Sequence, residues 1–597
     1  MKNIDVDVFV VGAGPAGLTT AALLAREGAG VTAITRYPGL ANSPRAHIIN
    51  QRTMEVFRDL GVEDRVIASA MPATLMGQVV WAESFTGPEI ARRRAWGASA
   101  DRRSDYAGAS PCDLTNIHQH VLEPILCEAA REYGADVVFN LELVSMRQED
   151  ERVVSLCRDR VTGERVRVVS RYAVGADGDN SAVCREIGFE VEGMMGLGHM
   201  VNHWIKADLS PYTAHRPGAL YQVFRPGGGA TVDNAVFVNV RPWDEWVMSV
   251  PYDPAGGRPD TSTGAVVRTV RAYVGDEALD VRPVSSSTWT INEAHAEVMH
   301  QGRVVIAGNA AHRHPPAGGL GANTCVQDAF NLAWKLRLLL DGLGGDSLLA
   351  AYTEERAPVA RQIVQRANTS LAALMAIPAA LGLEPGQSVE EGQARLDARL
   401  ADTPEGVECR RRLAEAVRMQ DHNFNALGVE LGQRYSSATI VPDETVVQPV
   451  EDPELFHVAC TTPGAPLPHV WLARGGRQLS SLDLVGRGRF TVLTGIGGDG
   501  WRDAARVLSE ELGIALDTVV IGPCRDVEDV YGDWASIRGI EEDGCLLVRP
   551  DHHISFRAMQ GSGAPEDVLR AALTTSLAHR AGPADAGPAR TGAASSA

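Results

Sequence analysis

Residues 6–28 read VDVFVVGAGPAGLTTAALLAREG, and this stretch decides the fold of the first part of the chain. An apolar, β-branched run comes first, a glycine-rich turn follows, and an alanine- and leucine-rich segment completes it. The strand-like residues VTAIT come next. Strand, turn, helix and strand in this order predict the opening βαβ unit of a doubly wound α/β sheet.

The turn carries the pattern G-x-G-x-x-G between a predicted strand and a predicted helix, which is the context of a dinucleotide site. Glycines let backbone N–H groups and the helix N-terminus approach a pyrophosphate without obstruction by Cβ atoms. We therefore assign to cofactor binding Gly12, Gly14, Pro15, Ala16 and Gly17.

The acidic residue that usually holds the ribose about 20 positions later is absent from this sequence. Thr35 and Arg36 stand at the end of the second predicted strand instead. We therefore expect the ribose to be contacted by the Thr35 hydroxyl, by Arg36 or by the backbone.

Composition narrows the class of protein. The 597 residues are 45% hydrophobic and 22% charged, enough for more than one core. A formal net charge of -19 disfavours a nucleic-acid partner, because phosphates are bound by clustered Lys and Arg. The nine cysteines form no C-x-x-C pair, which favours reduced thiols in a cytoplasm over a zinc knuckle or a redox disulfide.

Neither a membrane segment nor a metal site is predicted. The longest uncharged stretch lies between Arg366 and Glu384, contains Pro378, and falls short of the roughly 20 apolar residues that span a bilayer. His312 and His314 have no acid or cysteine at a spacing that would complete a metal site.

Changes of pattern along the chain predict several domains. Alternating apolar positions such as ALYQVF indicate an inserted antiparallel sheet, and a later Ala-, Leu-, Glu- and Arg-rich segment indicates helices. A strand, a helix, a strand and a terminal hairpin then indicate a small α/β domain. The expected regions are a dinucleotide-binding domain in two parts (1–194 and 291–360), a substrate-binding sheet domain (195–290), a helical region and linker (361–464), the small α/β domain (465–575) and a disordered tail (576–597).

A second G-x-G-x-x-G pattern, GIGGDG, contains Gly495, Gly497 and Gly500. It also follows a predicted strand and opens a predicted helix. Two alternatives stay open for it: a separate nicotinamide site, or an ordinary βα turn in a domain too short for a full dinucleotide fold.

Two further segments extend the dinucleotide pattern: VGADGDNSAVCREIG (174–188) and VVIAGNAAHRHPPAGGLGANT (304–324). The second segment places a proline- and glycine-rich loop between an apolar strand and a predicted helix. A dinucleotide fingerprint combined with a second phosphate-proximal loop implies FAD.

With the opening stretch, these segments resemble the class A flavoprotein monooxygenases, the aromatic ring hydroxylases, and most strongly their phenol and dichlorophenol hydroxylase branch. The similarity covers residues 5–360, resumes at LGVELGQRYSSATIVPD (427–443) and extends through the C-terminal domain. The resemblance implies an α/β fold with a Rossmann-like FAD-binding domain of the GR2 type, an antiparallel-sheet substrate domain, and a C-terminal thioredoxin-like domain without redox cysteines.

Residue by residue, the resemblance assigns FAD contacts to Gln119, Asp177, Gly178 and Asn309. Asn309 stands where the family usually has an Asp that bonds the ribityl chain. Asn is isosteric with Asp and offers an acceptor and two donors, so we expect ribityl binding to survive with one negative charge fewer. Cys184 stands where relatives often carry Arg, which affects the nicotinamide side of this motif.

The resemblance places the loop PPAGGLGAN at the edge of the isoalloxazine ring. The N-terminus of the following helix would point at flavin N1 and O2 and favour the anionic reduced flavin by roughly 0.3–2 kcal/mol. The residues assigned to the cofactor here are Pro316, Gly319, Gly321, Ala322 and Asn323.

His47 and Arg45 are the candidate catalytic residues. Relatives with an acid at the position of His47 place it facing the phenol, and Arg45 would lie near the flavin or the nicotinamide. With an ordinary pKa near 6.5, His47 is largely unprotonated at neutral pH and is our candidate base for the substrate hydroxyl; a structural histidine is the alternative. His203 and Tyr221, on the predicted antiparallel sheet, are the next candidates for substrate contacts.

The resemblance implies an NAD(P)H-dependent flavoprotein monooxygenase that acts through a flavin C4a-hydroperoxide. Its partners would be FAD, NADPH or NADH, molecular oxygen, and a small phenolic or hydroxypyridine-type aromatic substrate. A cytoplasmic oxidoreductase of secondary metabolism is expected, and a homo-oligomer is compatible with the sequence. Three alternatives stay open: a Baeyer–Villiger-type oxygenase on a polyketide, a flavin reductase or dehydrogenase, and a flavin-binding protein without turnover.

Overall fold

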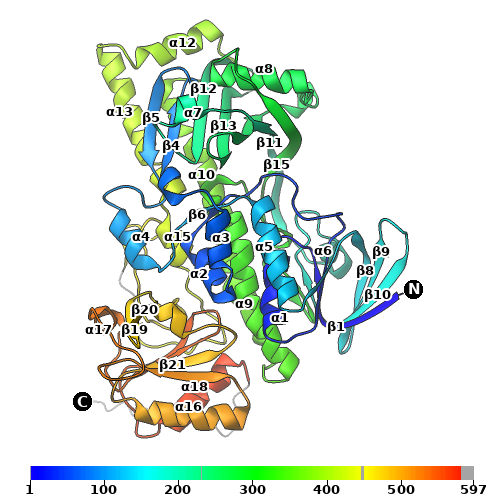
Figure 1. The fold of residues 1–597 in the computed structure, drawn as a ribbon, viewed down its shortest axis with the longest axis vertical. Helices are drawn as coiled ribbons and strands as arrows, with labels where there is room; N and C mark the ends of the chain where they lie inside the picture. The colour runs from blue at the N-terminus through cyan, green and yellow to red at the C-terminus, as the bar shows by residue number, and fades with distance from the viewer. Residues whose placement is uncertain (1, 230, 446–448, 580–597) are drawn as a thin grey trace, which may run out of the picture. The chain divides into compact units, whose positions relative to one another are not determined.

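The computed structural model describes residues 2–229, 231–445 and 449–579 (Figure 1). Most of the predicted disordered tail, from residue 580 onward, lies outside the described residues. Two compact units divide the chain: the first contains the described residues of 1–333, 356–433 and 448–458, and the second those of 334–355, 434–447 and 459–597. None of the helices in the described ranges combines the length and apolarity needed to cross a bilayer.

The first sheet has the strand order β16-β17-β10-β1-β2-β7, and β17, β10, β1, β2 and β7 run parallel. Its centre is apolar and buried on both faces, as a parallel sheet requires. The ends of neighbouring strands are in register, with Val11 opposite both Gly175 and Ile34. The strands are β1 (Lys2–Val11), β2 (Val31–Ile34), β7 (Asp136–Val138), β10 (Arg165–Gly175), β16 (His300–Gln301) and β17 (Val304–Ile306).

Two long helices contact strands of this sheet, and a third follows its strand β17. Helix α1 (Pro15–Arg26) follows β1 directly and contacts α5 (Gln119–Glu132), while α9 (Gly321–Asp341) follows the loop after β17. The remaining elements of the first half of this unit are β3 (Ile48–Ile49), α2 (Gln51–Leu60), α3 (Glu63–Ser69), α4 (Arg103–Ala109), β6 (Thr115–Asn116), β8 (Leu141–Glu149), β9 (Arg152–Asp159), α6 (Ala182–Ile187) and α7 (Ser210–Thr213).

The second sheet has the order β18-β15-β11-β14-β13-β12-β4-β5 and is antiparallel except for the parallel pair β12 and β4. The sequence predicted this sheet from residues 195–290 alone. Two strands from much earlier in the chain, β4 and β5, extend one edge, and β18 adds a short strand at the other. The strands are β4 (Gln78–Ala82), β5 (Glu89–Arg94), β11 (Glu192–Lys206), β12 (Leu220–Gly228), β13 (Val232–Arg241), β14 (Glu245–Pro251), β15 (Arg282–His295) and β18 (His312–Arg313).

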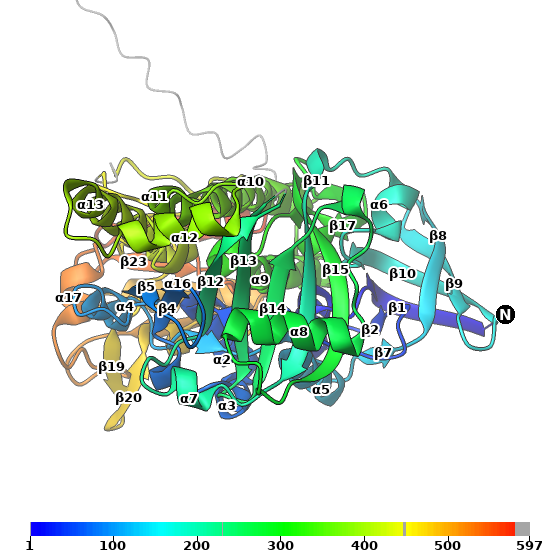
Figure 2. The same cartoon turned by 90° about the horizontal axis from the view of Figure 1, so that it is seen from above.

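Different helices cover the two faces of this sheet (Figure 2). Helix α8 (Thr263–Val274) packs on the face that carries Phe237 and Trp246. The opposite face, which carries Trp81 and Phe224, packs against α11 and α13. The helices of the 348–431 region are α10 (Leu348–Leu374), α11 (Ala376–Leu381), α12 (Val389–Ala398), α13 (Pro404–Arg418), α14 (Asp421–Phe424) and α15 (Leu427–Leu431).

The second unit is thioredoxin-like. Its sheet has the order β22-β21-β23-β24, in which β21 and β22 are parallel and the other pairs are antiparallel. The core continues to Leu577 and Ala578, which are buried, so it passes the expected boundary at residue 575. Its elements are β19 (Trp471–Arg474), β20 (Arg477–Ser480), β21 (Phe490–Thr494), α16 (Asp499–Leu512), β22 (Leu516–Val520), α17 (Asp533–Ile537), β23 (Cys545–Val548), β24 (Ile554–Ala558) and α18 (Pro565–Ser576).

Buried charges explain why residues 334–355 belong to the second unit. The Glu355 carboxylate accepts hydrogen bonds from Arg549 Nη1 at 2.5 Å and from Lys335 Nζ at 2.7 Å, and all three side chains are fully buried. Removal of one partner would leave an uncompensated buried charge, which is strongly destabilising. The last residues of α9 and the first of α10 are therefore fixed to the C-terminal sheet.

Candidate functional site

The predicted cofactor motifs meet at the carboxyl edge of the parallel sheet. The Ala176 N–H donates to Val11 O at 2.8 Å, and the Ala307 N–H donates to Gly175 O at 3.0 Å. The glycine turn after β1, the segment after β10 and the loop after β17 therefore lie side by side. Ligands of open α/β sheets bind at this edge, where the chain turns from strand to helix.

The three glycines of the first motif have different tasks. A Cβ on Gly12, whose φ is +118°, would lie 2.0 Å from Ala176 O, and a Cβ on Gly17 would lie 1.9 Å from Gly12 O. The fold itself requires these two glycines. A Cβ on Gly14 would meet its nearest described atom, Glu123 Oε1, only at 3.9 Å. Space is therefore open above Gly14, at the N-terminus of α1, where a ligand phosphate would lie.

Thr35 and Arg36 lie at the same edge, after β2, and both contact Tyr37. Thr35 Oγ1 accepts a hydrogen bond from the Tyr37 N–H at 3.3 Å. The Arg36 guanidinium donates to the Tyr37 hydroxyl at 3.2 Å and lies 5.2 Å from the centre of its ring. The Gly12 N–H donates to Ile34 O at 2.8 Å, so these two residues follow a strand that adjoins the glycine turn, and their contact with a ribose stays a prediction.

Sequence reasoning missed a buried carboxylate beside the glycine turn. Glu123 accepts hydrogen bonds from Gln119 Nε2 and from the Ala41 N–H, each at 2.6 Å. Burial raises the pKa of Glu123. The predicted contact residue Gln119 thus lies near Gly14 but directs its amide toward Glu123. Glu123 could have been found in the sequence as a charged residue on the buried face of an amphipathic helix.

Asp177 and Gly178, in the segment after β10, have different roles. Asp177 accepts hydrogen bonds from Ser181 Oγ and from the Ala182 N–H, each at 2.6 Å, and so anchors the start of α6. Gly178 has a φ of +78°, and no described atom lies within 4 Å of a Cβ built on it. The Asp177 side chain therefore shapes the turn, while Gly178 leaves room for a ligand.

Asn309 lies exposed beside this segment and pairs with an acid that the sequence did not single out. Asn309 Nδ2 donates to Asp179 Oδ1 at 2.9 Å. An Asp at position 309 would place two carboxylates at hydrogen-bond distance. The amide is therefore the complement of Asp179, which gives a physical reason for Asn at this position.

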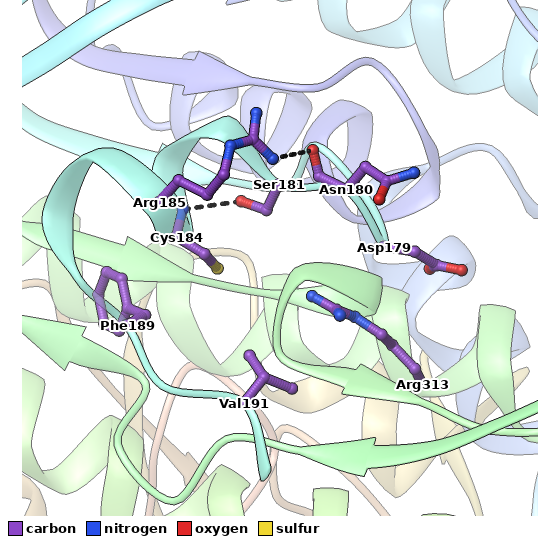
Figure 3. Close-up of a pocket in the computed structure, with 8 residues that line it drawn as sticks. All are labelled: Asp179, Asn180, Ser181, Cys184, Arg185, Phe189, Val191 and Arg313. Atoms are coloured by element: carbon purple, nitrogen blue, oxygen red, sulfur yellow. Dashed lines mark hydrogen bonds between the residues drawn. The ribbon is translucent and has the colours of Figure 1, made fainter. Parts of the chain in front are cut away.

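A pocket of about 240 Å³ adjoins this pair (Figure 3). Two guanidinium groups from different segments line it: Arg185, from α6, donates to Asn180 O at 3.1 Å, and Arg313, from β18, donates to Asn309 O at 3.2 Å. The Cys184 thiol donates to Ala310 O and is buried. Positive charge therefore comes to this pocket from Arg185 and Arg313, although position 184 carries none.

Asn323 fixes the loop predicted for the isoalloxazine edge. Its Oδ1 accepts from the Asn50 N–H at 2.9 Å, and its Nδ2 donates to Ile48 O at 2.9 Å and to Gly319 O at 2.6 Å. The side chain thus ties the loop to β3. Among the other residues assigned here, Pro316 is exposed, and Gly321 and Ala322 are half-buried at the start of α9.

A buried ionic network supports the same loop from below. Asp328 on α9 bonds His312 Nε2 and Arg356 Nε, each at 2.8 Å, and accepts from the Gly308 N–H at 3.0 Å. Although burial opposes ionisation, Arg356 and His312 hold the pKa of Asp328 below its ordinary value. The loop after β17 is therefore preorganised by a carboxylate that the sequence did not single out.

His47 has the tautomer that a base needs. Its Nδ1 donates to Asn116 Oδ1 at 3.0 Å, which leaves Nε2 as the nitrogen with a lone pair. The half-buried ring stacks on His118, with ring centres 5.1 Å apart. Burial lowers the pKa of His47 to about 4, so the ring is neutral at pH 7. Arg45, two residues earlier, is exposed.

The structure argues against a substrate role for Tyr221 and His203. Tyr221 is buried on the face of the second sheet that α8 covers, and its hydroxyl donates to Arg216 O at 2.7 Å. His203 lies opposite Met248, which belongs to the same core, and bonds Ser286 Oγ at 2.8 Å. Neighbouring residues of a strand face opposite ways, and the prediction that placed these two residues on the sheet did not determine which face they occupy.

The second glycine pattern is an ordinary βα turn. A Cβ on Gly495 would lie 2.5 Å from Glu542 O, and one on Gly497 would lie 2.7 Å from Asp543 Cβ. These glycines permit close packing within the thioredoxin-like domain, which favours the ordinary βα turn over a separate nicotinamide site.

Known proteins resemble this chain over nearly its full length. The FAD binding domain family matches residues 5–367, and the aromatic-ring hydroxylase C-terminal family matches residues 460–579. A 2,4-dichlorophenol 6-monooxygenase of Delftia acidovorans is 46% identical over 96% of this chain and 98% of its own length. A phenol 2-monooxygenase of Pseudomonas sp. (strain EST1001) is 41% identical over 95% of this chain and 92% of its own.

The solved structures include a similar fold with ligands bound. The flavin-dependent monooxygenase PieE, in complex with FAD and substrate, superimposes with a TM-score of 0.94 at 44% identity. The match covers 97% of this chain and all of that one.

Proposed function

The chain belongs to the FAD-dependent aromatic-ring hydroxylases, and from this premise we propose that it hydroxylates a phenolic or hydroxypyridine-type ring with NAD(P)H and molecular oxygen. One observation carries the proposal. His47, neutral and with Nε2 as its lone-pair nitrogen, directly precedes Ile48, which lies against Gly319 of the predicted flavin loop. A base for the substrate hydroxyl is thus held beside the place expected for the ring of the cofactor.

The described residues fit FAD. Gly14 and Gly178 leave open space where a Cβ would stand, and no side chain caps the N-terminus of α1 within the described ranges. The first backbone N–H groups of α1 are therefore free to bind a pyrophosphate. FAD, when bound, supplies the redox chemistry that activates oxygen.

The chain's own residues would prepare the substrate. A phenol with a pKa near 10 is neutral at pH 7, and its ring carbons become more nucleophilic as the proton leaves the oxygen. His47 Nε2 accepts this proton, while the bond from Nδ1 to Asn116 holds the ring in place. The stacked His118, buried beside it, helps to exclude water from the site.

We expect Asn309→Asp to weaken FAD binding by about fivefold, because a second carboxylate beside Asp179 adds like-charge repulsion of roughly 1 kcal/mol. Asp179→Asn in the same chain is expected to restore the affinity, because one donor and one acceptor then face each other again. Fluorescence titration of the apoprotein with FAD measures both variants. Equal affinity in the wild type and in Asn309→Asp would contradict this role of the pair.

The proposed function is tested with purified holoenzyme, NADPH or NADH, and a panel of phenols and hydroxypyridines. We expect substrate-dependent oxygen uptake and a product heavier by one oxygen atom. Oxidation of the nicotinamide with reduction of the organic substrate and no oxygen uptake would instead assign the protein to the flavin reductases. A ring-expanded ester or lactone product would assign it to the Baeyer–Villiger oxygenases.

A further inference from the structure

An apolar cluster adjoins the predicted flavin loop on the side of α15. Ile48, the first residue of β3, connects the two: it follows His47 in the chain and lies 3.2 Å from a Cβ built on Gly319. Helix α14, just before α15, contacts the loop at Ala317–Gly319. The cluster, here named the Ile48 cluster, consists of Ile48, Met71, Met76, Tyr106, Leu114, Ala219, Leu427 and Leu431.

Three polar groups are buried in or beside the Ile48 cluster. Tyr106, Gln51 and Glu430 are 5%, 1% and 6% exposed. No described residue offers a hydrogen-bond partner to Tyr106 Oη, Gln51 Oε1 or Glu430 Oε2. Buried polar atoms are rarely left unpaired in native proteins, so three of them in one region call for a partner from outside the chain.

The orientation of Gln51 is fixed. Its Nε2 donates to Tyr106 O at 2.9 Å and to Cys112 O at 2.8 Å. Both hydrogens of the amide are thereby used, and Oε1 is left as a buried acceptor.

Tyr106 and Glu430 are both neutral at pH 7. Burial raises the pKa of Glu430 to about 8. Burial, and then the charge of Glu430, raise the pKa of Tyr106 well above its ordinary value. A neutral carboxyl group and a neutral hydroxyl each donate and accept hydrogen bonds, and neither carries a charge that would attract a metal or an anion.

We propose that Tyr106, Glu430 and Gln51 form a subsite for a second hydrogen-bonding substituent, a hydroxyl or carbonyl group, on the aromatic substrate. The reacting ring would lie at His47, and the rest of the substrate would extend along the Ile48 cluster. This inference rests on the proposed function and deepens it. It assigns the substrate to the phenols with a second oxygen function, in preference to alkyl- or halophenols.

The test measures ligand binding apart from turnover. Dissociation constants are determined for the FAD-loaded enzyme from the change in flavin absorbance, with the meta and para isomers of chlorophenol, dihydroxybenzene and hydroxyacetophenone. The reference ligand is the dihydroxybenzene or hydroxyacetophenone that the wild type binds best. We expect Glu430→Leu to raise the dissociation constant for this ligand by about 10- to 100-fold, because the polar group of the ligand loses its hydrogen-bond partner. Chlorophenol binding is expected to change by less than about threefold.

Glu430→Gln is the matched control, because a neutral amide keeps both a donor and an acceptor at nearly the same place. Its dissociation constant for every ligand is expected to stay within about threefold of the wild-type value. Tyr106→Phe removes a single oxygen atom and is expected to show the same selective loss of affinity for the oxygenated ligands. The thermal midpoint of Glu430→Leu should equal or exceed that of the wild type, because the substitution removes an unpaired buried group.

The inference would be overturned if Glu430→Leu and Tyr106→Phe lost affinity equally for polar and apolar ligands. It would also be overturned if the wild type bound chlorophenol more tightly than every oxygenated ligand. Lower thermal midpoints together with such uniform losses would assign the three groups to structure, with buried water as their partner. Selective binding without an oxygenated product would leave the subsite in place and count against the proposed function alone.

Discussion

The Gly14→Ala variant is expected to fold as the wild type does and to lose its FAD. A Cβ at this position meets no described atom nearer than Glu123 Oε1 at 3.9 Å, and φ and ψ of -90° and -173° are allowed for alanine. The apoprotein should therefore keep its stability to within about 1 kcal/mol. The added methyl group occupies the space above the N-terminus of α1, so FAD affinity should fall by at least about 100-fold, roughly 2.7 kcal/mol.

Gly17→Ala serves as the contrasting control. Its Cβ would lie 1.9 Å from Gly12 O, so the protein itself must distort. We expect a clear drop in the thermal midpoint of the apoprotein for Gly17→Ala and almost none for Gly14→Ala. Bound flavin is measured by absorbance after reconstitution, and stability by calorimetry. Normal FAD content in Gly14→Ala would show that the pyrophosphate lies elsewhere.

His47→Ala is expected to lower hydroxylation of neutral phenols by about 10²–10⁴-fold, the range of a positioned acid–base group. FAD content should not change, because the glycine turn and the loop after β17 are built without His47. The loss should shrink for phenols acidic enough to bind as phenolates, since these need no base. If His47→Ala hydroxylated neutral phenols at the wild-type rate, His47 would have a structural role and not a catalytic one.

The pH dependence of hydroxylation distinguishes a base at position 47 from a structural histidine. Burial lowers the pKa of His47 to about 4, so the imidazole stays unprotonated and active throughout the range from about pH 6 to 8. Asn116→Asp places a carboxylate at Nδ1 and raises the pKa of His47. Activity of this variant should therefore fall as the pH drops through the raised pKa, where the wild type stays constant.

The sequence predicted the cofactor edge of the fold because local chemistry determines it. Gly12 and Gly17 are required by contacts within one strand–turn–helix unit, and such contacts follow from residues close together in the chain. The order of the C-terminal elements predicted a small α/β domain for the same reason, and the family resemblance identified this domain as thioredoxin-like. Strands β4 and β5 were missed, because only tertiary pairing with β12 brings 78–94 into the second sheet.

The substrate side of the site depends on register and on distant neighbours, which a single sequence does not encode locally. A shift of one residue decides whether Tyr221 or its neighbour faces α8. Asp179 became part of the site only through its contact with Asn309, 130 positions away in the chain. Glu430 lies in a segment that resembles the family, but only its burial, within electrostatic reach of Tyr106, gives it a chemical role.

Turnover under isotopically labelled oxygen gas tests the central claim most directly. The purified FAD-loaded protein is given NADPH or NADH and its best phenolic ligand, and the product is analysed by mass spectrometry. The proposed function predicts one labelled oxygen atom in the hydroxylated ring for each nicotinamide oxidised, and loss of that product in His47→Ala while flavin remains bound. A product that carries oxygen from water, or nicotinamide oxidation that yields only hydrogen peroxide with every ligand of the panel, would contradict it.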